Sequence, residues 1–203
     1  MEDKLKEAVK VYNKIASIYS KYNYHKLMQF QLTKFSSLLK GKRVLDAGCG
    51  IGRDVEYLIE EGLDVVGVDI AKNMVAEAKK NVPKGAFKVM DFRKMKFKVK
   101  SFDGIWCMHC LEHIDKKEIL NTFKEFNRVL DAGGIIYLAV YEGEGEKKVV
   151  KTEYLDEERI FVLYKEEEMK EFLVEAGFTI LSSEISVVDE GMKWLEVYAE
   201  KKG

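Results

Sequence analysis

Residues 44–54, Val-Leu-Asp-Ala-Gly-Cys-Gly-Ile-Gly-Arg-Asp, join an apolar, strand-like run to a helical pattern through glycines at every second position. Gly48, Gly50 and Gly52 allow a sharp turn and a close backbone approach to a ligand, where any Cβ atom would clash. The N-terminus of the helix that follows offers unpaired N–H groups at the same place. The segment therefore predicts a ligand site at the end of a strand.

The spacing around these glycines indicates the kind of ligand. A dinucleotide fingerprint needs a third glycine three positions after the second, where this chain has Arg53, and the Gly-Lys-Ser/Thr of a phosphate-binding loop is absent. Two acids stand out instead, because Asp46 precedes the glycines and Asp69 closes the apolar run 63–69. An acid at the tip of a second strand is well placed to bind both ribose hydroxyls. The pattern favours a nucleoside cofactor over a nicotinamide dinucleotide.

The order of these motifs resembles the class I S-adenosylmethionine-dependent methyltransferase family. The family's first motif is an acid followed by Gly-x-Gly-x-Gly, and its second is an acid that closes the next strand. Segments 89–92, 102–114 and 128–134 resemble its adenine-binding turn, its fourth-strand motif and the turn before its fifth strand. The resemblance covers roughly residues 10–200. The main alternative, a strand-to-helix turn in some other α/β protein, would explain neither acid.

The resemblance implies S-adenosyl-L-methionine as the cofactor and S-adenosyl-L-homocysteine as the product. It implies that Asp46 orients the ammonium group, that Asp69 binds the ribose and that Asp91 accepts the adenine amino group. The alternative is a helix N-cap for Asp69 and Asp91, and core packing for Ile70 and Cys107. The cofactor-binding residues expected on this basis are Tyr19, Asp46, Gly48, Cys49, Gly50, Gly52, Asp69, Ile70, Met74, Asp91, Phe92 and Cys107.

The N-terminal tyrosines form a second group of candidate ligand contacts. Residues 12–19 match Tyr-x-x-Ile-Ala-x-x-Tyr, a pattern in which many small-molecule members of the family cover the cofactor with a tyrosine. The match implies that Tyr19 lies over the cofactor, where its hydroxyl or ring would meet the carboxylate or the sulfonium. The alternative is an aromatic stripe packed on the core.

His109 and His113 follow the expected fourth strand, where acceptor and methyl group meet in this fold. We take His109 as the candidate catalytic base for an oxygen or nitrogen acceptor, because an imidazole exchanges protons near neutral pH. His113 is expected to be structural. Glu112 would neutralise a histidine, bind an amine or cap the next helix.

Residues 142–164 are expected to form an insertion on the acceptor side of the site. The polar, glycine-containing stretch 142–148 is expected to be flexible. Arg159 would either bind an acceptor carboxylate or form a surface ion pair with Glu157 or Glu158. The residues expected to shape the acceptor pocket are Tyr141, Glu142, Arg159 and Tyr164.

Strand and helix signals alternate along the chain, which predicts an α/β fold with a parallel sheet and helices on both faces. The resemblance implies a Rossmann-like, seven-stranded, mostly parallel sheet with its last strand antiparallel, and an N-terminal helical cap. Besides two N-terminal helices, we expect strands at 42–47, 64–69, 86–90, 102–108, 134–141, 159–164, 178–188 and 192–200, and helices at 53–61, 72–80, 116–130 and 165–176. A single methyltransferase domain, 1–203, would comprise a cap (1–40), a cofactor-binding core (41–141), the insertion (142–164) and a C-terminal helix and strands (165–203).

Charge and composition bear on partners and location. Lysine and arginine number 34 against 35 acids, so the formal net charge of −1 makes a nucleic acid partner unexpected, although residues 88–100 are locally basic. No apolar run approaches the ~18 residues that span a bilayer, and the charged N-terminus lacks a signal-peptide core, so we expect no membrane association and a cytoplasmic location. Cys107 and Cys110 flank His109, but without a second cysteine pair they predict no metal site. The abundance of Lys and Glu resembles a thermophile composition.

Methyl transfer from a sulfonium is an in-line displacement, so positioning the two reactants matters more than any obligatory catalytic side chain. We expect S-adenosylmethionine-dependent methyl transfer to the oxygen, nitrogen or carbon of a small-molecule acceptor, by a monomer or homodimer. Two alternatives stay open: an RNA or protein methyltransferase, and a non-catalytic protein that binds the adenosyl cofactor. The Asn-Pro-Pro-Tyr-like motif of amino-group nucleic acid methylases is absent at the fourth strand, which disfavours a nucleic acid substrate.

Overall fold

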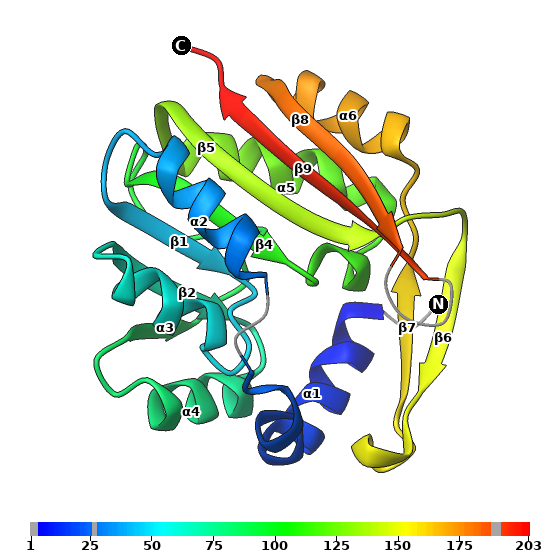
Figure 1. Cartoon of the computed structure of the whole chain (residues 1–203). Helices are drawn as coiled ribbons and strands as arrows, with labels where there is room; N and C mark the ends of the chain where they lie inside the picture. The colour runs from blue at the N-terminus through cyan, green and yellow to red at the C-terminus, as the bar shows by residue number, and fades with distance from the viewer. Residues whose placement is uncertain (1–3, 26–27, 188–191) are drawn as a thin grey trace.

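A twisted seven-stranded sheet organises the computed structural model, which describes residues 4–25, 28–187 and 192–203 (Figure 1). Its strand order is β3-β2-β1-β4-β5-β9-β8, and neighbours from β3 to β5 pair in parallel. β9 runs antiparallel to both β5 and β8, which confirms the expected antiparallel last strand. The strands are β1 (Arg43–Ala47), β2 (Asp64–Asp69), β3 (Ala86–Val89), β4 (Phe102–Met108), β5 (Leu130–Tyr141), β8 (Phe178–Val187) and β9 (Lys193–Lys201).

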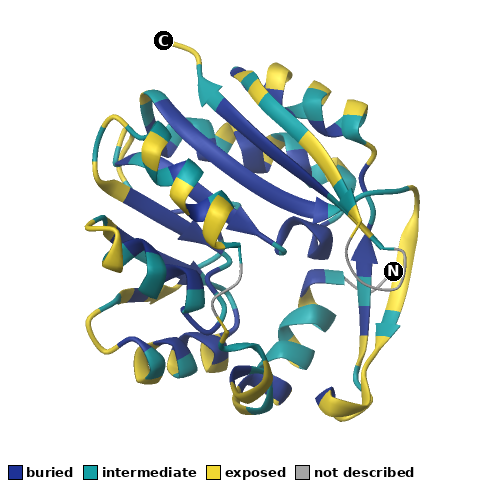
Figure 2. Ribbon diagram, in the orientation of Figure 1, coloured by how far each residue is buried: buried dark blue, intermediate teal, exposed yellow. Residues whose placement is uncertain are grey.

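Helices pack on both faces of this sheet, as expected. The buried side chains of α2, α3 and α4 share one apolar cluster with Trp106, whereas those of α5 and α6 share another with the adjacent Ile105. Successive residues of a strand point to opposite faces, so β4 is buried from both sides (Figure 2). The helices are α2 (Gln29–Leu38), α3 (Arg53–Glu60), α4 (Lys72–Asn81), α5 (Lys116–Val129) and α6 (Glu166–Glu175).

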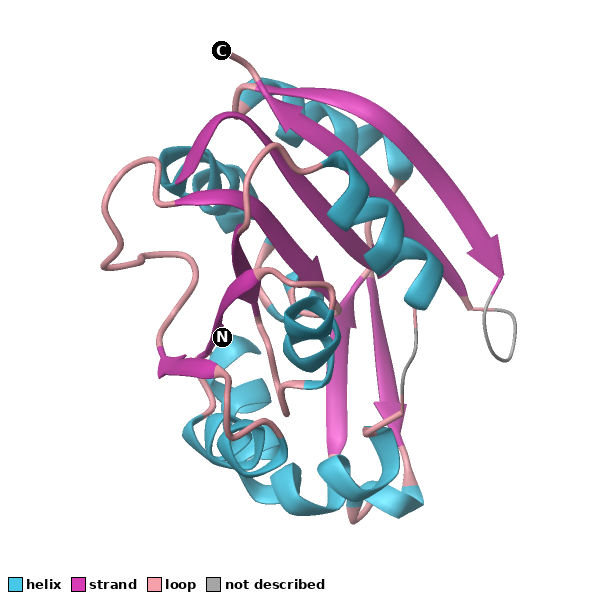
Figure 3. Ribbon diagram, turned by 60° about the vertical axis from the view of Figure 1, so that its left-hand side comes forward, coloured by secondary structure: helices cyan, strands magenta, loops and turns pink. Residues whose placement is uncertain are grey.

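Helix α1 (Lys4–Asn23) and a hairpin of β6 (Glu146–Val150) and β7 (Glu158–Val162) lie outside the seven-stranded sheet. The two hairpin strands form a separate antiparallel sheet, and α1 contacts both α4 and β7 (Figure 3). The prediction of a flexible stretch at residues 142–148 is wrong from residue 146 onward, because β6 begins there. β6 carries little apolar alternation to reveal it, because four of its five residues are exposed and its ladder partner lies on the distant β7.

The strand order reverses between β1 and β4, the position at which open α/β sheets bind ligands beyond the carboxyl ends of their strands. The glycine loop follows β1, and the short 3-10 turn Leu111–His113 lies just after β4. Both loops therefore emerge at the same edge of the sheet, facing α1 and the hairpin (Figure 1). Among the described residues, no helix has the length and apolar character needed to cross a membrane.

Candidate functional site

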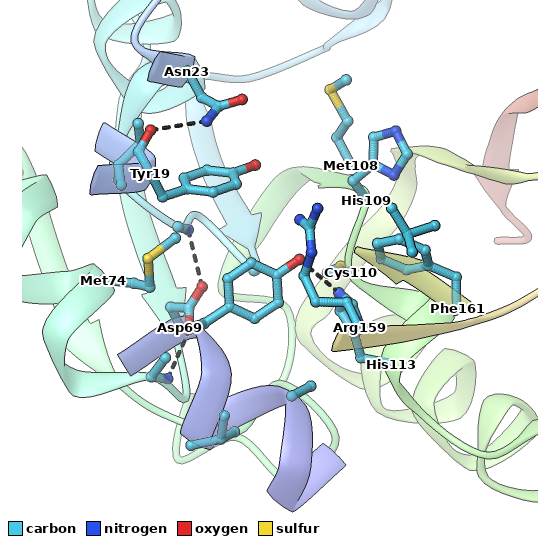
Figure 4. Close-up of a pocket in the computed structure, with 18 of the residues that line it drawn as sticks. Tyr19, Asn23, Asp69, Met74, Met108, His109, Cys110, His113, Arg159 and Phe161 are labelled. Carbon is cyan, nitrogen blue, oxygen red and sulfur yellow. Dashed lines mark hydrogen bonds between the residues drawn. The ribbon is translucent and has the colours of Figure 1, made fainter. Parts of the chain in front are cut away.

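A cavity of about 940 Å³ lies at this edge of the sheet (Figure 4). Its walls come from the glycine loop, the tip of β2, the segment after β4, α1 and the β6–β7 hairpin. Ligand pockets commonly measure roughly 300–1,000 Å³, so this one has room for a nucleoside cofactor together with a small second ligand. We call the wall built by the loops after β1 and β2 the cofactor side, and the wall built by the segment after β4 and the hairpin the acceptor side.

The glycine loop lies on the cofactor side and is held by the neighbouring strand. The backbone N–H groups of Gly48 and Cys49 both donate to the carbonyl oxygen of Val68, over 2.8 and 3.0 Å. Gly48 has a φ of +81°, and a Cβ atom there would lie 2.5 Å from the Cβ of Cys110. Two loops from different strands therefore meet at this glycine, which leaves no space for a side chain.

Asp69, at the tip of β2, presents a fixed carboxylate to the cavity. Its Oδ2 accepts a hydrogen bond from the backbone N–H of Gly50 (3.0 Å), and its Oδ1 accepts one from Ala71 (2.7 Å) (Figure 4). Each oxygen keeps a further lone pair for a ligand. Burial raises the pKa of Asp69 to about 6, despite the opposing effect of these backbone bonds. The carboxylate is oriented before any ligand arrives.

Asp46, the acid before the glycines, is the penultimate residue of β1, lines the cavity and is almost fully buried. Its Oδ2 has no hydrogen-bond partner among the described residues. Burial raises the pKa of this carboxyl well above its usual range, and the neighbouring Asp54 raises it further. An unsatisfied buried acceptor is costly, so Asp46 is suited to a ligand that brings a cation or a hydrogen-bond donor.

Most of the other expected cofactor residues also line the cavity. Tyr19 projects from α1 and Met74 from α4, on the side of the cavity where Asp69 lies (Figure 4). The expected residues that line it are Tyr19, Asp46, Gly48, Cys49, Gly50, Asp69, Ile70, Met74 and Phe92.

Three expected residues do not line the cavity. Gly52, with a φ of +82°, begins α3, and its missing side chain makes room for Phe87. The carboxylate of Asp91 is occupied by the guanidinium of Arg93, with Nη2–Oδ2 and Nε–Oδ1 distances of 2.8 and 3.1 Å. Cys107 is fully buried in β4. The cofactor contacts expected of Gly52, Asp91 and Cys107 stay predictions.

The fourth-strand segment contributes residues that follow Cys107. Met108 and Cys110 line the cavity, while the sulfur of Cys107 lies inside, 3.0 Å from the sulfur of Cys110. Cys110 also donates to the carbonyl oxygen of Ala47 over 3.1 Å, next to the glycine loop. Sequence spacing alone points to the strand end but does not show which residue faces the cavity.

His109 stands on the acceptor side in a strained backbone conformation, with a φ of +54°. Its Nδ1 lies 2.5 Å from Oε1 of Glu112, a fully buried carboxylate whose Oε2 has no hydrogen-bond partner among the described residues. Its ring packs against Tyr141 and Trp194, with centroids 4.7 and 4.6 Å away. Left-handed backbone at a non-glycine residue costs roughly 1–3 kcal/mol and tends to occur at functional positions.

His113 has a different environment in the same wall. Its Nε2 lies 3.1 Å from the hydroxyl of Tyr12, and its ring packs edge-on to that tyrosine. Burial lowers the pKa of His113 to about 4, so the imidazole is neutral at physiological pH. A neutral, buried histidine bound to a tyrosine hydroxyl is consistent with the structural role expected for it.

Arg159, on β7, is buried in the acceptor side rather than on the surface. The expected ion pair with Glu157 or Glu158 is wrong, because Glu157 pairs with Lys14 and Glu158 with Lys148. β7 places Arg159 on the face of the hairpin opposite to the exposed Glu158. Tyr164, also expected in the pocket, is in the core, and its hydroxyl donates to the carbonyl oxygen of Leu111 over 3.3 Å.

Several wall residues carry no sequence signal that marks them as ligand contacts. Arg53 is noticeable in the sequence only as the residue that replaces a glycine, yet it lines the cavity and binds Asp54 through an Nε–Oδ1 contact of 2.6 Å. Asp54 also accepts a hydrogen bond from the indole of Trp106 over 2.9 Å. The further wall residues not expected from sequence include Asn23, Asp54, Lys147, Lys148, Lys151, Tyr154, Phe161, Met192 and Trp194.

Comparison with known sequences identifies relatives of the central part of the chain. Residues 44–134 match a family model described as "Methyltransferase domain". The chain is 34% identical over 133 residues to the S-adenosyl-L-methionine-dependent Diels-Alderase iccD of Talaromyces variabilis, which spans 60% of this chain and 45% of that protein. It is 26% identical over 181 residues to phosphoethanolamine N-methyltransferase 2 of Caenorhabditis elegans, spanning 85% of this chain and 39% of that protein. The chain thus spans less than half the length of these two relatives.

Comparison with solved structures extends the likeness over nearly the whole chain. The Burkholderia thailandensis 1,6-didemethyltoxoflavin-N1-methyltransferase, solved with 1,6-didemethyltoxoflavin and S-adenosylhomocysteine, matches with a TM-score of 0.71 at 22% identity, covering 97% of this chain and 88% of that one. At this identity the likeness shows a shared fold. The matching family model begins within β1 and covers the glycine loop, Asp46 and Asp69. Both acids lie in strands of the seven-stranded sheet of the shared fold. Residues 44–134 therefore match a methyltransferase domain, and nearly the whole chain shares the fold of a methyltransferase solved with S-adenosylhomocysteine.

Proposed function

We propose that this chain binds S-adenosyl-L-methionine and transfers its methyl group to the oxygen, nitrogen or carbon of a small-molecule acceptor. The observation that carries the proposal is the arrangement of the single cavity described above. A glycine loop, an oriented Asp69 and an Asp46 whose Oδ2 has no hydrogen-bond partner in the described part of the chain lie on its cofactor side, and a histidine paired with a carboxylate lies on its acceptor side. S-adenosylhomocysteine would be the product.

The residues of the cofactor side fit an adenosyl cofactor. The lone pairs left on Asp69 would accept the two ribose hydroxyls, and the unsatisfied Oδ2 of Asp46 would accept the ammonium of the methionine portion. Ile70 would lie against the adenine, the backbone N–H of Phe92 would meet a ring nitrogen, and Tyr19 would cover the ligand from α1. The unsatisfied Asp46 is the strongest of these points, because a bound cation removes the cost of burying it.

We further propose that His109 acts as the general base when the acceptor atom carries a proton. The cofactor supplies the methyl group on a sulfonium, and the acceptor must lie in line with it. The Glu112 carboxylate fixes the orientation of the His109 ring through Nδ1. His113 is unsuited to this role, because its pKa near 4 makes it a weak base and its Nε2 is engaged by Tyr12.

Calorimetry with S-adenosylmethionine, S-adenosylhomocysteine and NAD tests the binding half of the proposal. Micromolar affinity for the adenosyl ligands and none for NAD is expected, because Arg53 stands where a dinucleotide site needs glycine. Tight binding of NAD with no binding of either adenosyl ligand would refute the assignment.

The transfer half is tested by S-adenosylhomocysteine release against a panel of small metabolites, with bulk tRNA and protein as rival acceptors. One relative is named as a Diels-Alderase that depends on S-adenosylmethionine, so cofactor binding alone does not establish methyl transfer. Release with a small metabolite supports the proposal, and release only with tRNA or protein supports the first alternative. Binding without release on any acceptor would favour the non-catalytic alternative.

Four broader expectations remain proposals. We propose a single domain in which residues 142–164 form the acceptor-side insertion, and a cytoplasmic monomer or homodimer. Size-exclusion chromatography with light scattering would fix the oligomeric state. The thermophile-like composition predicts high thermal stability. A melting temperature above about 90 °C would support that prediction, and one in the mesophile range of about 45–65 °C would contradict it.

A further inference from the structure

The guanidinium of Arg159 is buried without an acidic partner. Its side chain projects from β7 into the cavity, toward the region between the tyrosines of α1 and His109 (Figure 4). Only 7% of the residue is exposed, and within the described ranges its Nε has no hydrogen-bond partner. The described part of the chain provides it with no ion pair, since its sequence neighbours Glu157 and Glu158 bind lysines. Burying a cation in this way is costly unless a ligand completes the pairing.

The surroundings of Arg159 hold the cation in place but do not neutralise it. The centre of the guanidinium lies 4.8 Å from the ring centroid of Tyr154 and 5.5 Å from that of Phe161. Such cation–π contacts position the group, and the hydroxyl of Tyr12 shares a side-chain hydrogen bond with the guanidinium, while Nε stays without a partner among the described residues. The fully buried Glu112 does not line the cavity; its Oε1 is engaged by His109, and its Oε2 has no hydrogen-bond partner among the described residues. The cavity carboxylates Asp46 and Asp69 belong to the opposite, cofactor side.

The rest of the hairpin wall is also basic. Lys147, Lys148 and Lys151 line the cavity beside Arg159. Aromatic side chains complete this wall. The ring centroids of Phe161 and Tyr141 are 5.3 Å apart. The Tyr141 ring packs against the imidazole of His109, and the Phe161 ring packs against that of His113. A wall with one buried guanidinium, several lysines and flat apolar rings complements a compact, flat molecule that carries a negative charge.

We propose that Arg159 anchors the methyl acceptor, and that the acceptor therefore carries a carboxylate or phosphate group. This inference rests on the proposed methyltransferase function and specifies its substrate class. The planar fork of a guanidinium matches both anions through paired N–H···O bonds. Because Arg159 and His109 belong to the same wall, an acceptor held by its anion would place a second group near the candidate base.

The test measures binding of three probes to protein saturated with S-adenosylhomocysteine, using calorimetry. Benzoate and phenyl phosphate carry the two candidate anions on a flat ring, and benzamide is the neutral counterpart of benzoate. Benzoate or phenyl phosphate should bind, and the tighter of the two identifies the anion. Benzamide should bind at least tenfold more weakly, because it leaves the guanidinium without a negative partner.

Arg159→Gln should weaken binding of the preferred anion at least tenfold while changing S-adenosylhomocysteine affinity less than twofold. Arg159→Lys, which keeps the charge, should recover part of the loss and guards against a folding defect, which thermal unfolding of both variants will reveal. The matched control is Arg43→Gln, whose guanidinium binds Asp103 on the partly exposed edge of β1 and does not line the cavity. That variant should bind all probes as the unaltered protein does.

Two results would overturn the inference. Equal binding of benzoate and benzamide would show that the wall does not select a charge. A tenfold loss of S-adenosylhomocysteine affinity in Arg159→Gln, with the anions unaffected, would assign the guanidinium to the cofactor carboxylate instead. Failure of the unaltered protein to bind S-adenosylhomocysteine would be a separate outcome, because it removes the proposed function itself and this inference with it.

Discussion

The cofactor side and the acceptor side of the cavity are built in different ways. On the cofactor side, backbone atoms of the glycine loop and two acids lie within a short stretch of chain and are fixed by β1 and β2. On the acceptor side, side chains from α1, the segment after β4 and a separate hairpin come together from distant parts of the chain. The cofactor side can therefore be rigid and preformed, whereas the acceptor side depends on how well-separated elements pack.

The largest effect is expected at Gly48, where the two sides touch. Gly48→Ala forces a side chain into a φ of +81° and within 2.5 Å of the Cys110 Cβ. Strain and overpacking should together destabilise the fold by about 3 kcal/mol and abolish S-adenosylhomocysteine binding. Denaturant unfolding and calorimetry provide the two measurements.

Gly62→Ala is the matched control for that substitution. Gly62 has the same kind of backbone, with a φ of +82°, but a Cβ atom there would meet nothing within 4 Å. Only the conformational cost of about 1 kcal/mol should remain, with ligand binding unchanged. Equal losses for the two variants would show that the contact between the loops is unimportant.

Removal of the Asp69 carboxylate should cause the next largest effect, a loss of S-adenosylhomocysteine affinity. Asp69→Ala deletes the proposed acceptor of two ribose hydroxyls, and partial replacement by water should leave a loss of about 2 kcal/mol in S-adenosylhomocysteine binding. Calorimetry measures this directly, and Asp64→Ala, at the exposed start of β2, serves as the control. Unchanged affinity in the Asp69 variant would contradict the ribose role, and an unfolded variant would show that the acid is structural.

A smaller effect of the same Asp69 carboxylate is expected in the pH dependence of S-adenosylhomocysteine binding. Burial raises the pKa of Asp69 to about 6 from 3.8, so its ionisation costs stability in the ligand-free protein as the pH rises from about 4 to about 6. Ribose hydroxyls donate to the ionised form, whose fraction drops from about one half at pH 6 to about one tenth at pH 5, so S-adenosylhomocysteine affinity should fall about fivefold over that range.

Asp69→Asn removes this titration and should flatten the affinity profile between pH 5 and pH 6, apart from what the buried Asp46 contributes. Binding that strengthens as the pH falls would show that the protonated acid, acting as a donor, is the form that holds the ligand.

The smallest expected effect concerns the covers of the cavity, α1 and the region 142–164. S-adenosylhomocysteine should slow amide hydrogen exchange in both, because the ligand fills the space over which they pack. Mass spectrometry of peptides from these segments measures the change. Protection confined to residues 44–110, with both covers unchanged even in the presence of an acceptor, would contradict their role as lids.

Sequence reasoning succeeded where function depends on local backbone geometry. The glycine spacing and the acids Asp46 and Asp69 specify a strand, a tight loop and a second strand end, and all of these appear in the structure where expected. Asp91 shows the limit of such reasoning, because Arg93, two residues further on, offers its guanidinium to that carboxylate. The pattern does not reveal this competition between a ligand and a neighbouring side chain.

Long-range contacts account for the rest of what the sequence did not predict. Arg159 reads as a surface residue because acids precede it, but β6 and α1 enclose it once the hairpin forms. At the end of β4, the buried Cys107 is followed by the cavity-lining Met108, one residue further on, and Cys110, three residues further on. The direction in which a side chain points at the end of a strand depends on the turn that follows. The left-handed backbone conformation of His109 is not apparent from the sequence.

The separate ladder of β6 and β7 has an evolutionary consequence. The hairpin leaves the main sheet after β5 and returns before α6, with a parallel bridge between Glu142 and Tyr164 at its base. Its ends therefore lie next to each other, and residues 143–163 can diverge or be exchanged as one unit without altering the strands that hold the glycine loop. New acceptor preferences can arise by replacement of this unit, so homologues should differ most in it while keeping the loop after β1.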